Sequence, residues 1–340
     1  MTLLEGLLPT ALLAGLTLAA AAGVDLYLTL GLLALAPVLG FGEWLPETFR
    51  AAVAAPLPLV LAVGFYVLEF AAERSRPVRV YWHLPQTVVR PIAAGLLTAL
   101  LLDGVAVPGG ALVWSVLAAG IALLAHDLKT GAGMLGWLYG VEAPSGLLLS
   151  LAEDVVAIGL VTLALDAPAL SLGVTLAALV LAWVLTPSLL TASRLGRSLA
   201  WSRSWGSLVP FQWTDEGALA PAVREILAAV DRPFGKSLRV AGCARLESGR
   251  RRSLRAAWLV SGADTPLLLV RRGRRSPVLE ALPLTPAARL ESEALFVRLR
   301  LRSRPFLALV FPRAGPSRDA LEVEVERWGV AAGNPSLDRV

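Results

Sequence analysis

Long apolar segments are the feature of this sequence that most constrains its fold. They lie at about 7–38, 54–72, 89–107, 110–128, 146–165 and 169–192. Each is close to or longer than the roughly 20 mostly apolar residues that a helix needs to cross the hydrocarbon core of a membrane. Only segments that form all their backbone hydrogen bonds internally can span lipid. The sequence therefore predicts an α-helical polytopic membrane bundle with about six spans.

Charge divides the chain into two parts. Residues 1–200 carry 8 Lys and Arg against 12 Asp and Glu, whereas residues 201–340 carry 23 against 14. Overall, 56% of the residues are hydrophobic and 17% are charged, which is far more apolar than a water-soluble globular protein. We place the boundary near Trp205 and predict a transmembrane helical domain at 1–205 and a basic cytoplasmic domain at 206–340.

Basic residues predict the orientation of the spans. They cluster between the second and third spans, after the fourth and after the sixth: Arg74, Arg76, Arg79, Arg90, Lys129, Arg194, Arg197 and Arg203. Only Arg50 falls on the opposite side. Loops rich in Lys and Arg usually remain in the cytoplasm. We therefore expect a multi-pass protein of a bacterial inner membrane, with both termini in the cytoplasm.

The first apolar segment is too long for one simple span. From Gly6 to Gly42 it contains a single charged residue, Asp25, and a continuous helix of that length would be roughly 55 Å long. Gly23-Val24-Asp25 supplies a flexible residue followed by a good N-cap, which predicts a broken helix. Broken helices at membrane depth usually line a site or cavity. A single long, tilted helix with Asp25 capped by a neighbour is the alternative.

Acidic residues deep in the apolar segments define the candidate site. Glu153 and Asp154 are adjacent about eight residues inside the fifth span, where ionised groups are costly and usually face protein, a partner or water. The candidates for binding an ion or substrate are Asp25, Glu69, Arg90, His126, Asp127, Glu153 and Asp154. These residues predict a cation or proton site. Structural pairing of Arg90 with an acid, with snorkelling at the interface, is the alternative.

Several motifs in the same region resemble a known family. They are AGVDLYLTLGLLA, Leu68-Glu69-Phe70, WHLPQTVVRPIAAGLL and, above all, APSGLLLSLAEDVVAIGLV. Over about residues 5–195 the chain is similar to the bacterial membrane proteins grouped as DUF4126, a domain of unknown function. The resemblance implies a polytopic membrane fold and no established activity.

The polar C-terminal part has the pattern of a small α+β or mainly β domain. We expect an amphipathic helix at about 215–230 and a final helix near Ser317–Trp328. Between them, alternating or apolar segments predict six strands: SLRVAGCARLE, SLRAAWLVSG, TPLLLVRR, SPVLEALPL, EALFVRLRLR and PFLALVFPR. Six strands followed by one helix resemble a pleckstrin-homology or GRAM-like barrel in element order.

Arginine clusters in the predicted turns of this domain are candidates for binding anionic lipid headgroups. They comprise Arg250, Arg251, Arg252, Arg271, Arg272, Arg274 and Arg275. A solvated basic surface is the alternative. We expect no nucleic-acid partner, because platforms of aromatic residues for stacking bases are absent from this sequence.

The sequence contains no pattern that argues for an enzyme. Gly131-Ala-Gly-Met-Leu-Gly136 matches G-x-G-x-x-G but follows a predicted membrane helix, whereas a dinucleotide site needs a preceding strand. We assign no catalytic residue, cofactor or metal. The favoured function is a small transporter or channel-like protein with an acidic intramembrane site. The alternative is a membrane scaffold or sensor whose basic domain binds anionic lipid or a protein partner; homo-oligomerisation is left open.

Overall fold

A computed structural model describes most of the chain. The described residues are 9–139, 143–185, 187–204, 214–215, 239–248, 253–261, 267–270, 278–281, 289–293, 296–301, 306–312 and 317–327. The chain forms two compact units, Met1–Gly196 and Arg197–Val340, and each is described here by itself.

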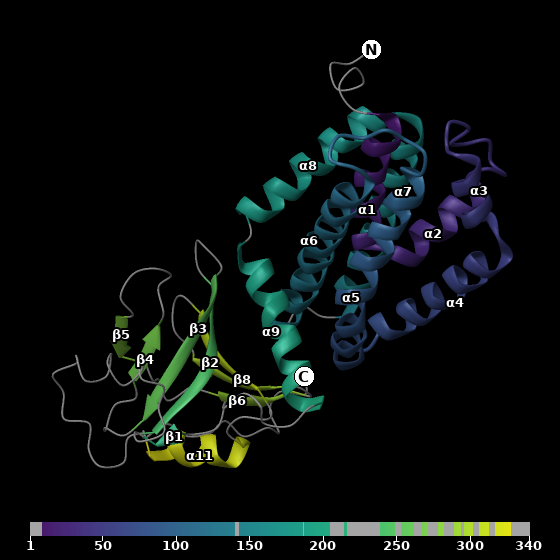
Figure 1. The fold of residues 1–340 in the computed structure, drawn as a ribbon. Helices are drawn as coiled ribbons and strands as arrows, with labels where there is room; N and C mark the ends of the chain where they lie inside the picture. Colours follow the sequence, from purple (N-terminus) through teal and green to yellow (C-terminus); the bar gives the residue numbers. More distant parts are fainter. Residues whose placement is uncertain are drawn as a thin grey trace. The chain divides into compact units, whose positions relative to one another are not determined.

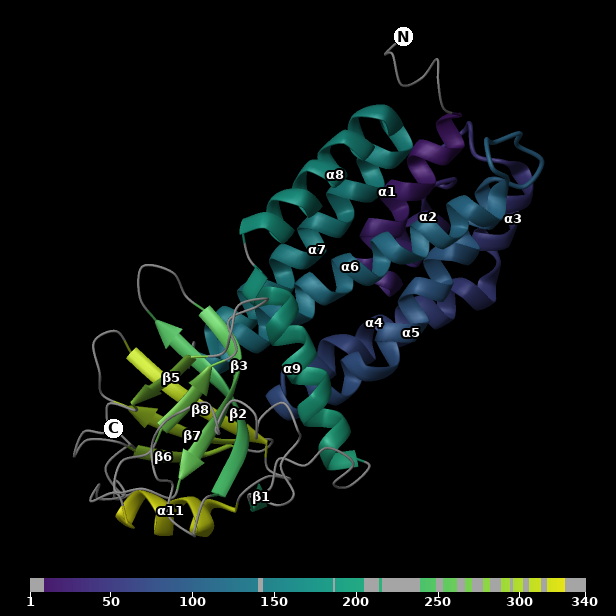
Figure 2. The same cartoon turned by 60° about the vertical axis from the view of Figure 1, so that its left-hand side comes forward.

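The first unit is built from helices (Figures 1 and 2). Their bounds are α1 Thr10–Val24, α2 Leu26–Leu35, α3 Glu47–Ala54, α4 Pro56–Glu73, α5 Arg76–Leu101, α6 Ala111–Leu138, α7 Ala143–Asp166 and α8 Pro168–Leu185, with α9 Pro187–Ser204 continuing into the second unit. The helical prediction for this part of the chain is confirmed.

Helix α1 forms the centre of this unit. Every residue from Ala11 to Gly23 is buried, and α5, α6, α7 and α8 all pack against it. An α-helix that is apolar on all sides is stable only when it is surrounded by other apolar groups. Along α1 the packing is closest at Gly23, where an added Cβ would lie 2.4 Å from the carbonyl oxygen of Ala122 on α6.

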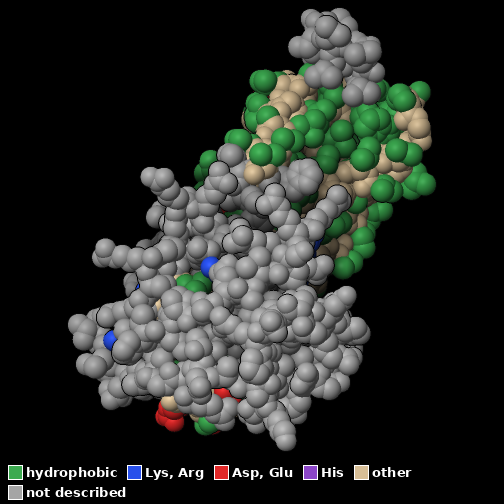
Figure 3. Space-filling view, turned by 90° about the vertical axis from the view of Figure 1, so that its left-hand side faces the viewer, with side chains coloured by type: hydrophobic (Ala, Val, Ile, Leu, Met, Phe, Trp, Pro, Cys, Tyr) green, Lys and Arg blue, Asp and Glu red, His purple; other side chains and the backbone are tan. Residues whose placement is uncertain are grey.

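Among the described residues, three helices are long and apolar enough to cross a membrane. They are Pro56–Glu73, Pro77–Leu101 and Ala111–Leu138. Shorter apolar helices cover Thr10–Val24, Leu26–Leu35 and Pro168–Ala182. Large apolar side chains are exposed along the outer helices, and hydrophobic atoms cover much of the visible face of the helical unit in Figure 3. These features are those of a membrane protein.

Two helices extend further than the sequence predicted. α5 begins at Arg76 rather than near residue 89, and α6 continues to Leu138 rather than ending near residue 128. Arg90 and Lys129 are therefore buried helix residues, so placing them in cytoplasmic loops was wrong. A lone cation beside an apolar segment predicts the end of a span, but a buried cation is tolerated inside a helix where acids pair with it, as they do with Arg90 and Lys129.

The second unit contains an antiparallel sheet (Figure 2). Its strands are β1 Thr214–Asp215, β2 Arg239–Ser248, β3 Ser253–Ser261, β4 Leu267–Val270, β5 Val278–Ala281, β6 Arg289–Ser292, β7 Phe296–Leu301 and β8 Phe306–Pro312. The order is β5-β4-β3-β2-β8-β7-β6, and β1 pairs with one end of β2. β2 joins the two meanders, with Ala244 opposite Ala256 on β3 and opposite Val310 on β8.

All six strand segments expected from the sequence are strands, and α11, Arg318–Arg327, is the expected final helix. Alternate residues of β2, β3, β7 and β8 form the core, and Leu321 and Val325 of α11 belong to the same cluster. Asp215, the first residue of the helix expected at 215–230, belongs to β1, whereas residues 216–230 and the seven candidate lipid-binding arginines lie outside the described residues.

The reactivity of the Cys243 thiol depends on whether the core of the sheet is folded. It is the only cysteine of the chain, it is buried, and burial raises the pKa of its thiol. Because the thiolate is the reactive form, we expect Cys243 to react with a disulfide reagent only when the sheet opens. Thiol titration of the native protein should therefore be much slower than titration of the chain unfolded in guanidinium. Equal rates would contradict the buried position.

A side chain at Gly23 should destabilise the helical unit. In Gly23→Ala, the new Cβ would meet the α6 backbone, and we expect a loss of about 1–3 kcal/mol from overpacking. Gly64→Ala on α4 is the matched control, because its added Cβ meets no atom within 4 Å and alanine favours the helix by about 0.5–1 kcal/mol. Thermal unfolding in detergent would compare the two, and equal stability would contradict the close contact of α1 with α6.

Candidate functional site

The first apolar segment is interrupted at Asp25. This residue has an extended backbone, with φ −145° and ψ 102°, between the end of α1 and the start of α2. The backbone N–H of Leu28 donates a hydrogen bond to Asp25 Oδ1 at 2.9 Å, so Asp25 is the N-cap of α2. The broken helix is therefore confirmed, and the single long helix is wrong.

Arg90 of α5 closes the other side of the break. Its side chain is fully buried, and Nη1 donates hydrogen bonds to the carbonyl oxygens of Gly23, at 2.8 Å, and Val24. Carbonyls at a helix C-terminus lack partners within the helix, so Arg90 satisfies the end of α1. Its Nη2 donates to Glu69 Oε1 on α4. One guanidinium therefore links the break to a buried carboxylate.

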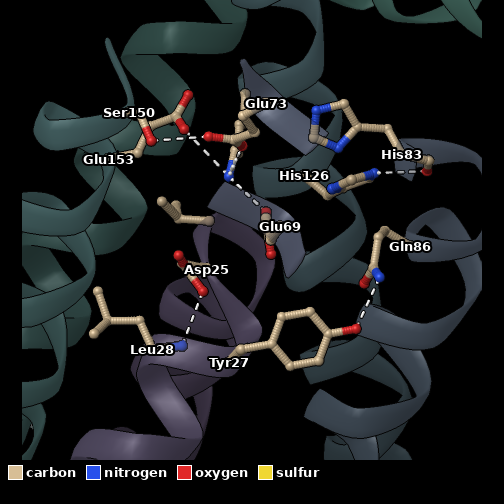
Figure 4. A network of polar contacts seen from close by, with 12 residues as sticks. Asp25, Tyr27, Leu28, Glu69, Glu73, His83, Gln86, His126, Ser150 and Glu153 are labelled. Carbon is tan, nitrogen blue, oxygen red and sulfur yellow. Dashed lines mark hydrogen bonds and ion pairs between the residues drawn. The ribbon is translucent and has the colours of Figure 1, made fainter. Parts of the chain in front are cut away.

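Lys129 of α6 is the centre of a polar cluster, whose acids Glu69, Glu73 and Glu153 are labelled in Figure 4. Its ammonium nitrogen lies 3.0 Å from Glu69 Oε1, 3.0 Å from Glu73 Oε1 and 3.2 Å from Glu153 Oε2. The side chain of Lys129 is 4% exposed and those of the three acids are at most 10% exposed. Carboxylates from α4 and α7 thus converge on one cation in the interior of the unit.

Further contacts hold the acids in place. Ser150 Oγ, one turn before Glu153 on α7, donates a hydrogen bond to Glu73 Oε2 at 2.8 Å. Arg79 of α5 lies 4.0 Å from the same oxygen. On the other face of α7, Asp154 Oδ2 accepts a hydrogen bond from Tyr66 at 3.0 Å. The adjacent acids Glu153 and Asp154 therefore have different partners, as the angle between consecutive helix residues requires.

Two histidines lie beside the cluster in Figure 4. The rings of His83 on α5 and His126 on α6 are 5.4 Å apart, and His126 Nε2 lies 3.4 Å from the backbone oxygen of His83. His83 Nδ1 is buried and has no hydrogen-bond partner. Asp127 lies elsewhere: its Oδ1 accepts a hydrogen bond from Ser193 of α9 at 3.0 Å.

The structure brings part of the candidate set together. Glu69, Arg90 and Glu153 form one network through Lys129, and Asp25 lies at the break that Arg90 closes. Asp154 and Asp127 accept hydrogen bonds from other partners, Tyr66 and Ser193. His126 packs against His83.

Sequence reasoning missed Lys129, Glu73 and Ser150. For two of them the helical period carried a signal, because Glu73 is four residues after Glu69 and Ser150 is three residues before Glu153. Residues at these spacings share a helix face. Lys129 gives no such signal, because it directly follows an apolar segment that ends near residue 128.

The cluster holds as many bases as acids, but one acid oxygen lacks a donor. Glu69, Glu73 and Glu153 face Arg79, Arg90 and Lys129, and Glu69 Oε2 is buried with no hydrogen-bond partner. A buried carboxylate oxygen without a donor favours a bound proton or cation, because an unsatisfied buried polar atom is costly. Within the described residues, no group of three or more His, Cys, Asp or Glu is arranged to hold a metal ion.

Comparison with known proteins identifies the helical unit. The family model "Domain of unknown function (DUF4126)" matches residues 12–188, which is more than half of the chain. The chain belongs to the DUF4126 family. Its match covers α1 to α8 and therefore contains the whole Lys129 cluster. No curated protein and no solved structure matches the chain.

Removing Arg90 should destabilise this DUF4126 protein strongly. Arg90→Met leaves Glu69 without one cation and two carbonyls without a donor, so we expect a loss of about 3–5 kcal/mol. Arg74→Met is the control, since Arg74 is exposed and its guanidinium lies over the Phe70 ring, 4.7 Å from the ring centroid. Adding Glu69→Gln to Arg90→Met should recover part of the loss. Similar melting temperatures for the two single variants would contradict the buried bridge.

Proposed function

We propose that this protein is a small transporter or channel-like protein of the bacterial inner membrane, in which a buried acidic site handles a cation or proton. The observation that carries the proposal is the convergence of Glu69, Glu73 and Glu153 on Lys129, among helices compatible with a membrane. Ionisable groups inside membrane segments are rare and usually mark ion or proton pathways.

The arrangement of the cluster favours a functional role over simple ion pairing. Replacing a buried structural ion pair by apolar residues is often neutral or stabilising. Here three acids from two helices share one lysine, although Arg79 and Arg90 lie beside two of them. The helix break at Asp25 lies next to this network, as is common where discontinuous helices bind ions in transporters.

The membrane arrangement belongs to the same proposal. We expect about six spans, with the first apolar segment broken at Asp25 and both termini in the cytoplasm. Arg74, Arg76, Arg79, Arg194, Arg197 and Arg203 support this orientation without Arg90 and Lys129. Membrane lipids are the expected partners, and neither a cofactor nor a nucleic acid is part of the proposal.

Flux through the purified protein tests the proposed function. In proteoliposomes with an imposed cation or pH gradient, we expect wild-type flux of protons or a monovalent cation above that of empty liposomes. Glu153→Gln should reduce it at least about tenfold, because it removes one charge from the Lys129 cluster.

Asp103→Asn is the matched control for Glu153→Gln. Asp103 is an exposed acid just after α5, so its variant should retain wild-type flux. Dye-detected pH change and a panel of monovalent cations would provide the readout. A wild-type protein without flux, or equal flux for Glu153→Gln and wild type, would rule out transport through this cluster.

A second candidate function concerns the C-terminal unit, as a sensor or scaffold that binds anionic lipid. Its support is the strand order: a four-strand meander, β2 to β5, meets a three-strand meander, β6 to β8, through the β2–β8 pair, and a helix follows. This order fits a pleckstrin-homology or GRAM-like domain. The excess of basic residues after residue 200 complements the negative surface of an inner leaflet.

Protease protection of the full-length protein tests lipid binding. We expect trypsin to cleave the arginine clusters at 250–252 and 271–275 more slowly in anionic than in zwitterionic nanodiscs, and the difference should disappear at high salt. Replacing Arg271, Arg272, Arg274 and Arg275 by Gln should weaken the protection of the remaining cluster. The same cleavage rate in both lipids would contradict lipid binding by this unit.

A further inference from the structure

The oxygens around Lys129 match the shape of an ammonium group. A primary ammonium carries three N–H donors, and three carboxylate oxygens from three different residues lie within 3.2 Å of Lys129 Nζ. They come from Glu69 and Glu73 on α4 and Glu153 on α7, whereas the lysine comes from α6. The oxygens are therefore positioned by helices other than the one that carries the cation.

Two of the three acids have partners besides the lysine. Glu69 accepts a hydrogen bond from Arg90 and Glu73 accepts one from Ser150, while Glu153 lies on the same face of α7 as Ser150. Removing the lysine would therefore leave Glu69 and Glu73 bound by other residues, and all three acids would lack their common cation. Glu69 Oε2, buried and without a hydrogen-bond partner, adds a further acceptor at the same place.

We infer that Glu69, Glu73 and Glu153 form a binding site for a primary ammonium group, which Lys129 occupies as a tethered ligand. Ammonium or a primary amine is then the class of cation that this site selects, and it binds by displacing the Lys129 ammonium. A guanidinium fits less well because its donors lie in one plane. A tetraalkylammonium has no N–H donor for the three oxygens.

Lys129 consequently competes with external cations for the three carboxylates. While its ammonium occupies the carboxylates, an external cation meets a filled site. The inference takes the acidic site of the proposed function and specifies its ligand, but the binding itself requires no flux. Binding and transport can therefore be tested separately.

Chemical rescue of a lysine-truncated protein tests the inference. Lys129→Ala should lower the melting temperature of the full chain in detergent, because three acids lose their cation. n-Propylammonium replaces the missing stem and ammonium, so we expect it to restore the melting temperature in a saturable way. Tetramethylammonium, guanidinium and n-propanol should give little or no recovery at the same concentration and ionic strength.

Two control variants make the rescue specific. The double variant Lys129→Ala/Glu153→Gln lacks one of the three carboxylate charges. It should therefore be less destabilised than Lys129→Ala, and it should bind n-propylammonium with at least about tenfold lower affinity. Leu128→Ala truncates the neighbouring buried residue on α6 and should not respond to any amine. In the wild type, n-propylammonium must displace Lys129, so a saturable rise should need at least about tenfold more amine than in Lys129→Ala.

The outcomes separate the inference from the proposed function. If all monovalent cations stabilise Lys129→Ala equally, or if no amine does, the ammonium site is overturned. If folded Lys129→Ala is obtained only when n-propylammonium is present throughout purification, the inference is supported. If neither Lys129→Ala nor Lys129→Gln yields folded protein under that condition, the inference is overturned. Amine rescue without any wild-type flux would retain the ammonium site and reject transport.

Discussion

The buried contact of Arg90 with the break between α1 and α2 is the interaction on which the helical unit depends. A broken helix inside an apolar bundle exposes carbonyls that neither lipid nor apolar side chains can satisfy. Arg90 supplies the donors, and its own charge then requires an acid, which Glu69 provides. Glu69 in turn contacts Lys129. The break between α1 and α2, the Arg90–Glu69 ion pair and the acids around Lys129 therefore form one connected network.

This network explains why the centre of the unit is polar although its surface is apolar. α1 is buried by helices on all sides and carries the break at its end, so the polar groups lie inside protein rather than in lipid. Small residues allow this packing, with Gly23 against α6 and Gly131 of α6 against the backbone of α9 at Leu189. The polar cluster is therefore enclosed by closely packed helices, where electrostatic interactions are strong.

Much of the fold could be predicted from the sequence because it depends on local patterns. Apolar length identified the helical part, Gly23 followed by Asp25 identified the break, and alternation identified the strands from β2 to β8 except the short β6. The partners in the site could not be predicted in this way. Lys129 meets acids that are 60, 56 and 24 residues away in the sequence, and only helix packing brings them together.

Infrared difference spectroscopy of the protein in lipid tests most directly whether the buried carboxylates bind and release protons or ammonium from solution. If the Lys129 cluster is a working site, a pH change or added ammonium should produce a carboxyl difference signal, and Glu153→Gln or Glu69→Gln should alter it. A wild-type spectrum without any carboxyl response to pH or ammonium would show that the cluster is closed to water and ions, and would contradict a role in transport.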